Sequence, residues 1–165
     1  MATKADIEFL WRAFDNAQNL IARMDVKAAG LVALVAVLEA GLAIAATGVD
    51  KISDLSIWLF MVSALHAVSL VVVCVEVLLV HWARGRPGGT PSLLFPGDVG
   101  QTPDAAQYLR RVADANHAHE VAGQVHALGQ IYAKKAAAIN RAVRAFAIML
   151  VSWLILISAA ILRST

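Results

Sequence analysis

Three ionisable side chains lie inside long apolar runs of the sequence, where lipid or protein interior would solvate a charge poorly. They are Glu39, His66 and Glu76. Residues of this kind normally face the interior of a helix bundle or a water-filled path. Counted along their runs, Glu39 and His66 fall at a similar depth near the middle of a bilayer. We predict that they form either a hydrogen-bonded pair that only locks two helices together or part of a conducting path.

Glu76 lies closer to the end of its apolar run and invites a simpler interpretation. Arg84 and Arg86 follow within ten residues, beyond the end of that run. Because a nearby opposite charge favours the ionised form of a carboxyl group, either arginine can neutralise Glu76. We therefore predict a structural role for Glu76.

A second group of charged residues marks the places where polar sequence enters the apolar runs. Its members are Asp25, Lys27, Lys134, Lys135, Arg141 and Arg144. Such cations can bind anionic lipid headgroups and set the orientation of the chain. Alternatively, a few of them point between helices and bind an anionic ligand. Gln124 favours the second hypothesis, because an amide beside a packed helix face needs a hydrogen-bond partner.

No arrangement of residues predicts catalysis or metal binding. His117 and His119 are two residues apart on a predicted helix and point to different faces, and His126 lies two turns beyond His119. The sequence has no Walker loop, no dinucleotide-binding glycine pattern and no nucleophile elbow. The formal charge of +2 and the lack of a basic stripe argue against nucleic acid. We therefore expect that the protein has no enzymatic activity, no metal site and no cofactor.

The elements that position these residues are predicted from three apolar blocks. The chain has 165 residues, of which 59% are hydrophobic and 16% charged, against about 25% charged in a soluble domain. The excess falls in residues 28–47, 55–80 and 145–162, none of which contains proline. A helix of about 20 apolar residues crosses a bilayer. The predicted class is an all-α integral membrane protein with three transmembrane helices.

The distribution of lysine and arginine predicts the orientation. Four lie before the first span and eight lie in residues 81–144, whereas the first loop and the C-terminal end hold one each. Because cytoplasmic segments are enriched in these residues, we expect a cytoplasmic N-terminus and a periplasmic C-terminus.

Two polar segments are predicted to form a cytoplasmic helical bundle. Residues 1–27 form an amphipathic helix, with Thr3 as its N-cap, that runs without a break into the first span. Residues 104–144 form a long helix that continues into the third span, with Thr102 as its predicted N-cap and Pro103 at the first helical position. The two helices differ in length, so we also expect a homo-oligomer. The predicted packing stripe of the long helix is Tyr108, Val112, Ala115, His119, Ala122, Val125, Leu128, Tyr132, Ala136, Ile139 and Val143.

Residues 81–103 form the remaining cytoplasmic segment. Within them, residues 83–101 hold three of the four prolines and five of the ten glycines. This composition predicts turns and loop structure. Such a long connection is either a plain linker or a functional binding loop.

Several short motifs resemble one family, the transmembrane effectors of bacterial Pycsar anti-phage immunity. Residues 25–29 (DVKAA) are similar to the motif with which the family's first span opens, and residues 92–99 (SLLFPGDV) to its loop containing Phe-Gly-Asp. The spacings of its long helix are matched by Tyr108, Leu109, Glu120, Gln124, Ile131 and Lys135. The resemblance covers nearly the whole chain, including the order of the spans.

The resemblance implies a function. A partner pyrimidine cyclase would make cyclic UMP (cUMP) or cyclic CMP (cCMP) on infection. The effector would bind this nucleotide through its cytoplasmic helices and then impair the bacterial inner membrane, causing abortive infection. The residue types that a phosphate and a flat base require are present at Lys27, Phe95, Tyr108, Arg110, Gln124 and Lys135.

Two other functions fit the same composition. One is a constitutive membrane scaffold whose helical domain docks a cytoplasmic partner. The other is a small channel or transporter subunit that uses Glu39 and His66.

Overall fold

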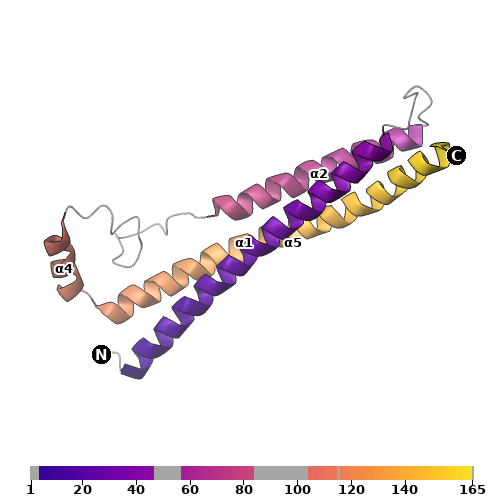
Figure 1. The fold of residues 1–165 in the computed structure, drawn as a ribbon. Helices are drawn as coiled ribbons and strands as arrows, with labels where there is room; N and C mark the ends of the chain where they lie inside the picture. The colour runs from indigo at the N-terminus through magenta and orange to yellow at the C-terminus, as the bar shows by residue number, and fades with distance from the viewer. Residues whose placement is uncertain (1–3, 47–56, 84–103, 115, 165) are drawn as a thin grey trace. The chain divides into compact units, whose positions relative to one another are not determined.

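The computed structural model describes residues 4–46, 57–83, 104–114 and 116–164, and within them it is built from helices. These are α1 (Lys4–Ala46), α2 (Ile57–Trp82), α4 (Ala105–Asp114) and α5 (His117–Ser164) (Figure 1). No strand occurs among the described residues. The prediction of an all-α protein is confirmed.

Two of the helices are very long and uninterrupted. α1 has 43 residues and α5 has 48, which corresponds to roughly 65 and 72 Å at about 1.5 Å per residue. α1 therefore joins the predicted amphipathic segment to the first span, and α5 continues into the third, as the sequence indicates. Thr3, the predicted N-cap of α1, lies outside the described residues.

The predicted long helix from residue 104 is wrong at one point, because it is interrupted between α4 and α5. Asn116 begins the second helix: its side-chain Oδ1 accepts a hydrogen bond from the His119 amide at 3.2 Å. The physical reason is local, since Asp and Asn side chains compete for backbone hydrogen bonds and favour caps over helix interiors. Asp114 and Asn116 together supply that signal.

The start of α4 is also corrected. Asp104 is the N-cap of α4, because its Oδ1 accepts a hydrogen bond from the Gln107 amide at 2.7 Å. Asp104 O accepts a second bond from the Tyr108 amide at 3.2 Å. An ionised N-cap also interacts favourably with the positive end of the helix dipole. Thr102 itself lies outside the described residues.

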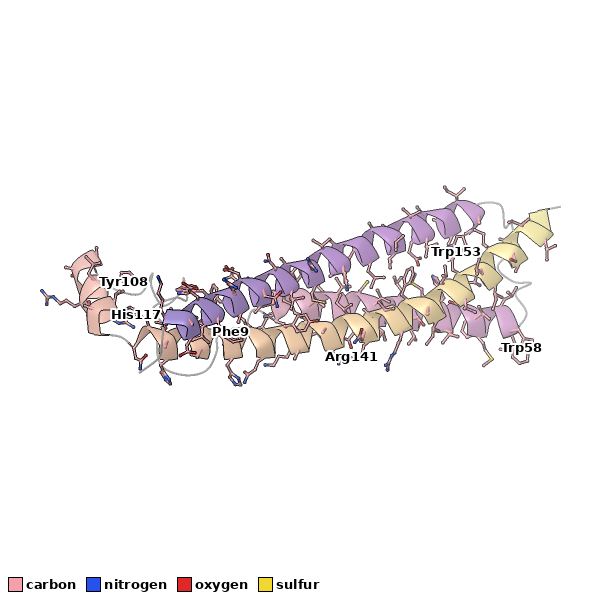
Figure 2. All side chains as sticks on the ribbon, turned by 90° about the horizontal axis from the view of Figure 1, so that it is seen from below. Phe9, Trp58, Tyr108, His117, Arg141 and Trp153 are labelled. Atoms are coloured by element: carbon pink, nitrogen blue, oxygen red, sulfur yellow. The ribbon has the colours of Figure 1, made fainter. Side chains whose placement is uncertain are left out.

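Three helices are long and apolar enough to cross a membrane, namely α1, α2 and α5. Only 17% to 22% of their most apolar windows is buried inside the chain. Apolar surface exposed on this scale needs an apolar environment around it. Trp58, at one end of α2, is 71% exposed (Figure 2). Trp82, at the other end of α2, is 82% exposed. Rings at the two lipid–water interfaces would be exposed in this way.

The chain packs as two compact units. Unit 1 comprises Met1–Arg23 and Ala83–Lys134, and unit 2 comprises Met24–Trp82 and Lys135–Thr165. Unit 2 therefore holds the apolar parts of α1, α2 and α5, which lie side by side (Figure 1). Unit 1 holds the first part of α1, all of α4 and the first part of α5.

The core of unit 2 is a seam of residues spaced three or four apart on each helix. The buried residues are Met24, Ala28, Leu31 and Val35 on α1, His66, Ser69, Val73, Val77 and Val80 on α2, and Lys135, Ala138, Ile139, Ala142, Ala145, Met149 and Ser152 on α5. This spacing of about 3.5 residues is that of left-handed helix packing. Many members are alanine or serine, which let helix backbones approach closely in lipid.

The predicted packing stripe of the long helix is shifted. Ala122 and Val143 are exposed, whereas the neighbouring Val121 and Ala142 are buried. Among the stripe residues that the structure describes, which exclude Ala115, Ile139 alone lies in the buried core. Near the third span the prediction selected the larger Val143, but lipid solvates large apolar side chains and the smaller Ala142 forms the helix contact. At the other position the larger residue, Val121, is the buried one, so residue size does not account for the shift there.

Candidate functional site

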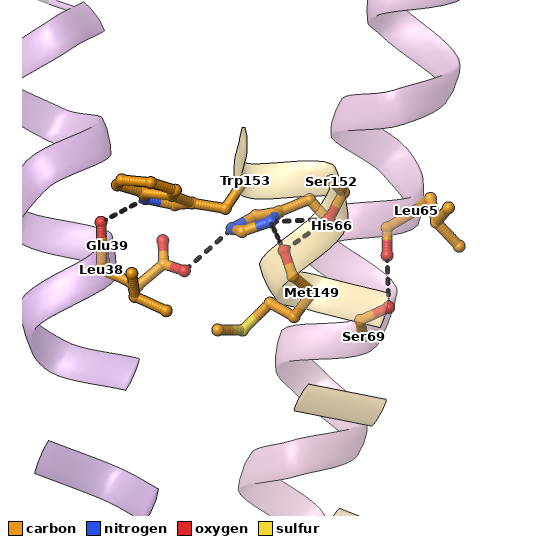
Figure 3. A network of polar contacts seen from close by, with 8 residues as sticks. All are labelled: Leu38, Glu39, Leu65, His66, Ser69, Met149, Ser152 and Trp153. Carbon is orange, nitrogen blue, oxygen red and sulfur yellow. Dashed lines mark hydrogen bonds and ion pairs between the residues drawn. The ribbon is translucent and has the colours of Figure 1, made fainter. Parts of the chain in front are cut away.

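Unit 2 contains a polar network that connects its three helices (Figure 3). Glu39 on α1 lies opposite His66 on α2, with Glu39 Oε1 2.9 Å from His66 Nε2. The other ring nitrogen, Nδ1, lies 3.0 Å from Ser152 Oγ on α5. His66 is 5% exposed and Ser152 is 2% exposed. The structure thus shows the hydrogen bond between Glu39 and His66, and a part in a conducting path stays a prediction.

Ser152 was missed by the sequence reasoning. A serine in an apolar run usually bonds to its own helix, and Ser152 Oγ does donate to Met149 O at 2.8 Å. The available signal was the chemistry of His66, because a buried imidazole has two nitrogens and Glu39 satisfies only one. A hydrogen bond between α5 and α1 was also not predicted: Trp153 Nε1 donates to Leu38 O at 2.7 Å.

Glu76 is neutralised, but by a different residue from those predicted. Arg141 on α5 donates from Nε to Glu76 Oε1 at 2.6 Å and from Nη2 to Oε2 at 2.9 Å. This hydrogen bonding raises the pKa of the Arg141 guanidinium above its usual value. Arg84 and Arg86 lie outside the described residues. Glu76 and Arg141 thus form a bidentate ion pair, a contact of the kind that the predicted structural role of Glu76 calls for.

Lys135 is the most deeply buried charged residue of the described chain. Its side chain is 1% exposed, and Nζ donates to Asp25 Oδ1 on α1 at 2.5 Å. Lys27, two residues beyond Asp25, is exposed and lines a groove with Gly30, Leu31, Leu34, Ile139 and Val143. The structure thus locates both predicted ligand residues of unit 2, Lys27 and Lys135. The ammonium group of Lys135 is already hydrogen-bonded to a carboxylate.

Unit 1 contains a cavity of about 300 Å³ that brings together aromatic side chains from three helices. It is lined by Ile7 and Trp11 of α1, Tyr108 and Val112 of α4, and His117, Glu120 and Val121 of α5. The volume is at the lower end of the range for small-molecule pockets, which are mostly apolar with a few polar groups. Figure 2 marks Tyr108 on α4 and His117 at the start of α5.

The cavity contains one of the predicted ligand residues, and two others lie on the helices that line it. Tyr108 lines it. Gln124 is 8% exposed and lies one helical turn beyond Glu120, on the same face of α5. Arg110, two residues after Tyr108, is exposed on α4 and is not among the lining residues. Phe95 lies outside the described residues. Trp11, His117 and Glu120 line the cavity but were not among the predicted ligand residues, although Glu120 matches the spacing of the family's long helix.

These features define a class: an all-α protein with three membrane-spanning helices joined by a polar network, together with a helical unit that encloses a small aromatic cavity. Residues 9–162 match the sequence model of the Pycsar effector protein domain, and the chain belongs to that family. It is therefore a membrane effector of an antiviral defence system, and its family is not a known enzyme family. No curated protein and no solved structure matches the chain.

Proposed function

We propose that this effector binds a cyclic pyrimidine mononucleotide, cUMP or cCMP, in the cavity of unit 1 and then impairs the bacterial inner membrane. The nucleotide would come from a partner pyrimidine cyclase. Membrane damage would stop growth of the cell or kill it before phage mature, which is abortive infection. We further propose that the N-terminus is cytoplasmic, the C-terminus is periplasmic, and the effector is a homo-oligomer. The observation that carries the proposal is the cavity with aromatic walls on three helices.

The lining of the cavity suits a nucleobase. Trp11, Tyr108 and His117 offer flat surfaces for stacking, and Ile7, Val112 and Val121 exclude water from its edges. Stacking of a base on an aromatic side chain contributes about 1–3 kcal/mol per base. Glu120 and the nearby Gln124 are residue types that can accept from, or donate to, the polar edge of a pyrimidine.

The phosphate of a cyclic nucleotide carries one negative charge and needs a cation. We propose that Arg110 supplies it from α4; the predicted ligand residue Phe95 lies outside the described residues. Lys27 and Lys135 are the other predicted ligand residues, and in the structure Lys135 is paired with Asp25. Of these two lysines, Lys27 is the better donor to an anion, because it is exposed and Lys135 is already bonded.

α1 and α5 give the proposal a route to the membrane. Each is one uninterrupted helix that contributes residues both to the cavity and to the polar network of the spans. A ligand shifts an equilibrium between two arrangements only by binding one of them more tightly. We propose that the resting effector is closed and that the nucleotide binds the open arrangement more tightly.

Binding is tested by titration calorimetry of the full chain in detergent with cUMP and cCMP, and with cAMP as a purine control. We expect Trp11→Ala and Tyr108→Ala to weaken binding about tenfold to a hundredfold, because each removes a stacking surface. Phe9→Ala is the matched control, since Phe9 is an aromatic residue of the same unit, 70% exposed and outside the cavity lining. Equal affinity in all three variants would contradict the cavity as the site.

Membrane impairment is tested by dye release from liposomes that contain the full chain. We expect release on addition of the nucleotide that binds, and loss of that release in Trp11→Ala. Release that is the same with and without nucleotide would favour a constitutive channel. A chain that binds no nucleotide and causes no release would favour the membrane scaffold.

A further inference from the structure

A groove of about 510 Å³ lies between α1 and α5 in unit 2 and is polar only at one end. Lys27 lies at that end, where the polar part of α1 meets its apolar run. The remaining lining is apolar and consists of Gly30, Leu31 and Leu34 of α1 and Ile139 and Val143 of α5. Because the α1 residues recur every three or four positions, they share one face of that helix. The groove therefore leads from a cation into apolar walls.

The burial of the lining residues shows that the groove is open on one side. Leu31 and Ile139 are buried and form its floor, whereas Leu34 and Val143 are exposed and form its rim. Gly30 leaves space between Lys27 and the rim, since no atom lies within 4 Å of a Cβ built there. Both helices are long and apolar enough to cross a membrane. The open side of the groove therefore faces lipid.

The charges at the polar end leave one lysine without a counterion. Asp25, two residues before Lys27, accepts a hydrogen bond from Lys135, so these two charges neutralise each other. In the parts of the chain that the structure describes, no carboxylate forms an ion pair with Lys27. The polar end of the groove thus presents an ammonium group that is available to an anion.

We propose that this groove binds one anionic phospholipid, with its phosphate at Lys27 and an acyl chain along the apolar lining. Basic sites between membrane helices at the level of the headgroups select anionic lipids. The lysine stem can lie along apolar surface while its ammonium group reaches the headgroup layer. An acyl chain is the occupant that fits the walls, because an empty groove would forfeit the dispersion contacts of its lining. The proposal does not depend on nucleotide binding in unit 1.

A lipid in this groove would contact two spans at once. Its acyl chain would touch α1 through Leu31 and Leu34 and α5 through Ile139 and Val143. A ligand that binds the packed helices and not the separated ones stabilises the packed arrangement. An anionic membrane should therefore hold α1 and α5 together more firmly than a neutral one.

Native mass spectrometry of the full chain in detergent measures the lipid preference, with phosphatidylglycerol and phosphatidylcholine of identical acyl chains in equal amounts. We expect the first bound lipid to be phosphatidylglycerol by about fivefold, the factor that one lysine near an anionic surface contributes. Lys27→Gln should bring the two lipids close to parity. Lys134→Gln is the matched control, because Lys134 is an exposed lysine outside the groove. The same preference in Lys27→Gln and the wild type would overturn the proposal.

A second variant tests the groove instead of the charge. Gly30→Leu places a side chain where the acyl chain would lie, and the folded chain has room for it. We expect this variant to retain as little phosphatidylglycerol as Lys27→Gln does. Ala29→Leu, at the exposed neighbouring position outside the lining, should retain as much as the wild type. Unchanged lipid in Gly30→Leu would contradict the proposal, and a dimer lost in that variant without a change in lipid would assign the groove to a second copy of the chain.

Two further measurements separate a lipid from a free anion. Glycerophosphoglycerol, which is the same headgroup without acyl chains, should not displace bound phosphatidylglycerol; displacement at equal concentration would show that charge alone is recognised. Chemical unfolding in nanodiscs of each lipid should find the wild type more stable in phosphatidylglycerol. Lys27→Gln should narrow that difference and Lys134→Gln should keep it. Equal stability of the wild type in both lipids would overturn the link between α1 and α5.

Discussion

Lys135 on α5 and Asp25 on α1 form an ion pair in which the two partners differ greatly in exposure. The lysine side chain is 1% exposed and the aspartate side chain is 33% exposed. Water can therefore solvate Asp25 without its partner, but it cannot solvate the ammonium group. The pair lies at the end of the apolar seam of unit 2, followed along α5 by Ala138.

This asymmetry predicts that the two halves of the pair respond differently to substitution. Asp25→Ala leaves a buried, unpaired ammonium group, and we expect it to reduce the free energy of unfolding by about 3 kcal/mol. Lys135→Met replaces the cation with an apolar chain of similar volume, and we expect a change below about 1 kcal/mol, because such replacements are often neutral. Chemical unfolding in detergent measures both values.

Lys134→Met is the matched control, because Lys134 is the exposed neighbour of Lys135. We expect it to leave stability unchanged. If Lys135→Met were as destabilising as Asp25→Ala, the ammonium group would be stabilising the bundle through contacts other than Asp25.

The Arg141–Glu76 pair has the opposite distribution of exposure and yields a second prediction. Arg141 is 54% exposed in its side chain and Glu76 is 12% exposed. Arg141→Met should destabilise unit 2 more than Glu76→Gln, because it leaves a buried carboxylate without its cation. Arg141→Lys should recover only part of the loss, since an ammonium group cannot make the two-point contact. Unfolding at low and high salt measures all three, and equal stability of Arg141→Met and Arg141→Lys would contradict this.

The spans and their continuity with the polar helices could be predicted from the sequence. Hydropathy and helix breakers are local properties, and the stretch around Lys27 contains no breaker. The pairing of Glu39 with His66 could be predicted as one of two alternatives. An unpaired ionisable group is unfavourable in lipid, and these two groups lie at the same depth. Their third partner, Ser152, could not be predicted, because its contact depends on how α5 is rotated about its own axis.

Other features depend on how the helices face one another, which one sequence does not specify. Arg141 lies 65 positions from Glu76 and reaches it only because α5 packs beside α2. Arg84 is close to Glu76 in sequence, and this proximity misled the prediction. The shift of the packing stripe from Val143 to Ala142 has the same origin, because lipid removes the hydrophobic drive that selects large residues for a core.

The contact between Gly41 and Trp153 yields a third prediction. A Cβ atom added at Gly41 would lie 3.4 Å from Trp153 Cζ2, an ordinary contact. Gly41→Ala should therefore be tolerated and should stabilise α1 by up to about 1 kcal/mol, the usual difference in helix propensity. Gly41→Leu should displace the indole and break its hydrogen bond to Leu38 O, which is 2.7 Å long in the structure. Tryptophan fluorescence and chemical unfolding measure the two effects.

Gly30 provides the control for this pair of substitutions, because no atom lies within 4 Å of a Cβ built there. We expect Gly30→Leu to be tolerated where Gly41→Leu is not. Similar losses at both positions would indicate a general cost of bulky residues on α1 and would contradict the specific contact with Trp153.

The fourth prediction concerns the cap of α4, the short helix that carries Tyr108 to the cavity. Asp104 Oδ1 accepts from the Gln107 amide at 2.7 Å, and its loss in Asp104→Ala should cost about 1 kcal/mol. A helix of 10 residues is marginal without such support, so the amides of Gln107 and Tyr108 should exchange hydrogen about five times faster. Asp104→Ser retains a capping oxygen and should exchange at nearly the wild-type rate.

The same two variants test whether α4 must be ordered for nucleotide binding. Asp104 does not line the cavity. Weaker cUMP or cCMP binding in Asp104→Ala but not in Asp104→Ser would therefore mean that an ordered α4 is required for binding. Faster exchange with unchanged binding would place the nucleotide away from Tyr108.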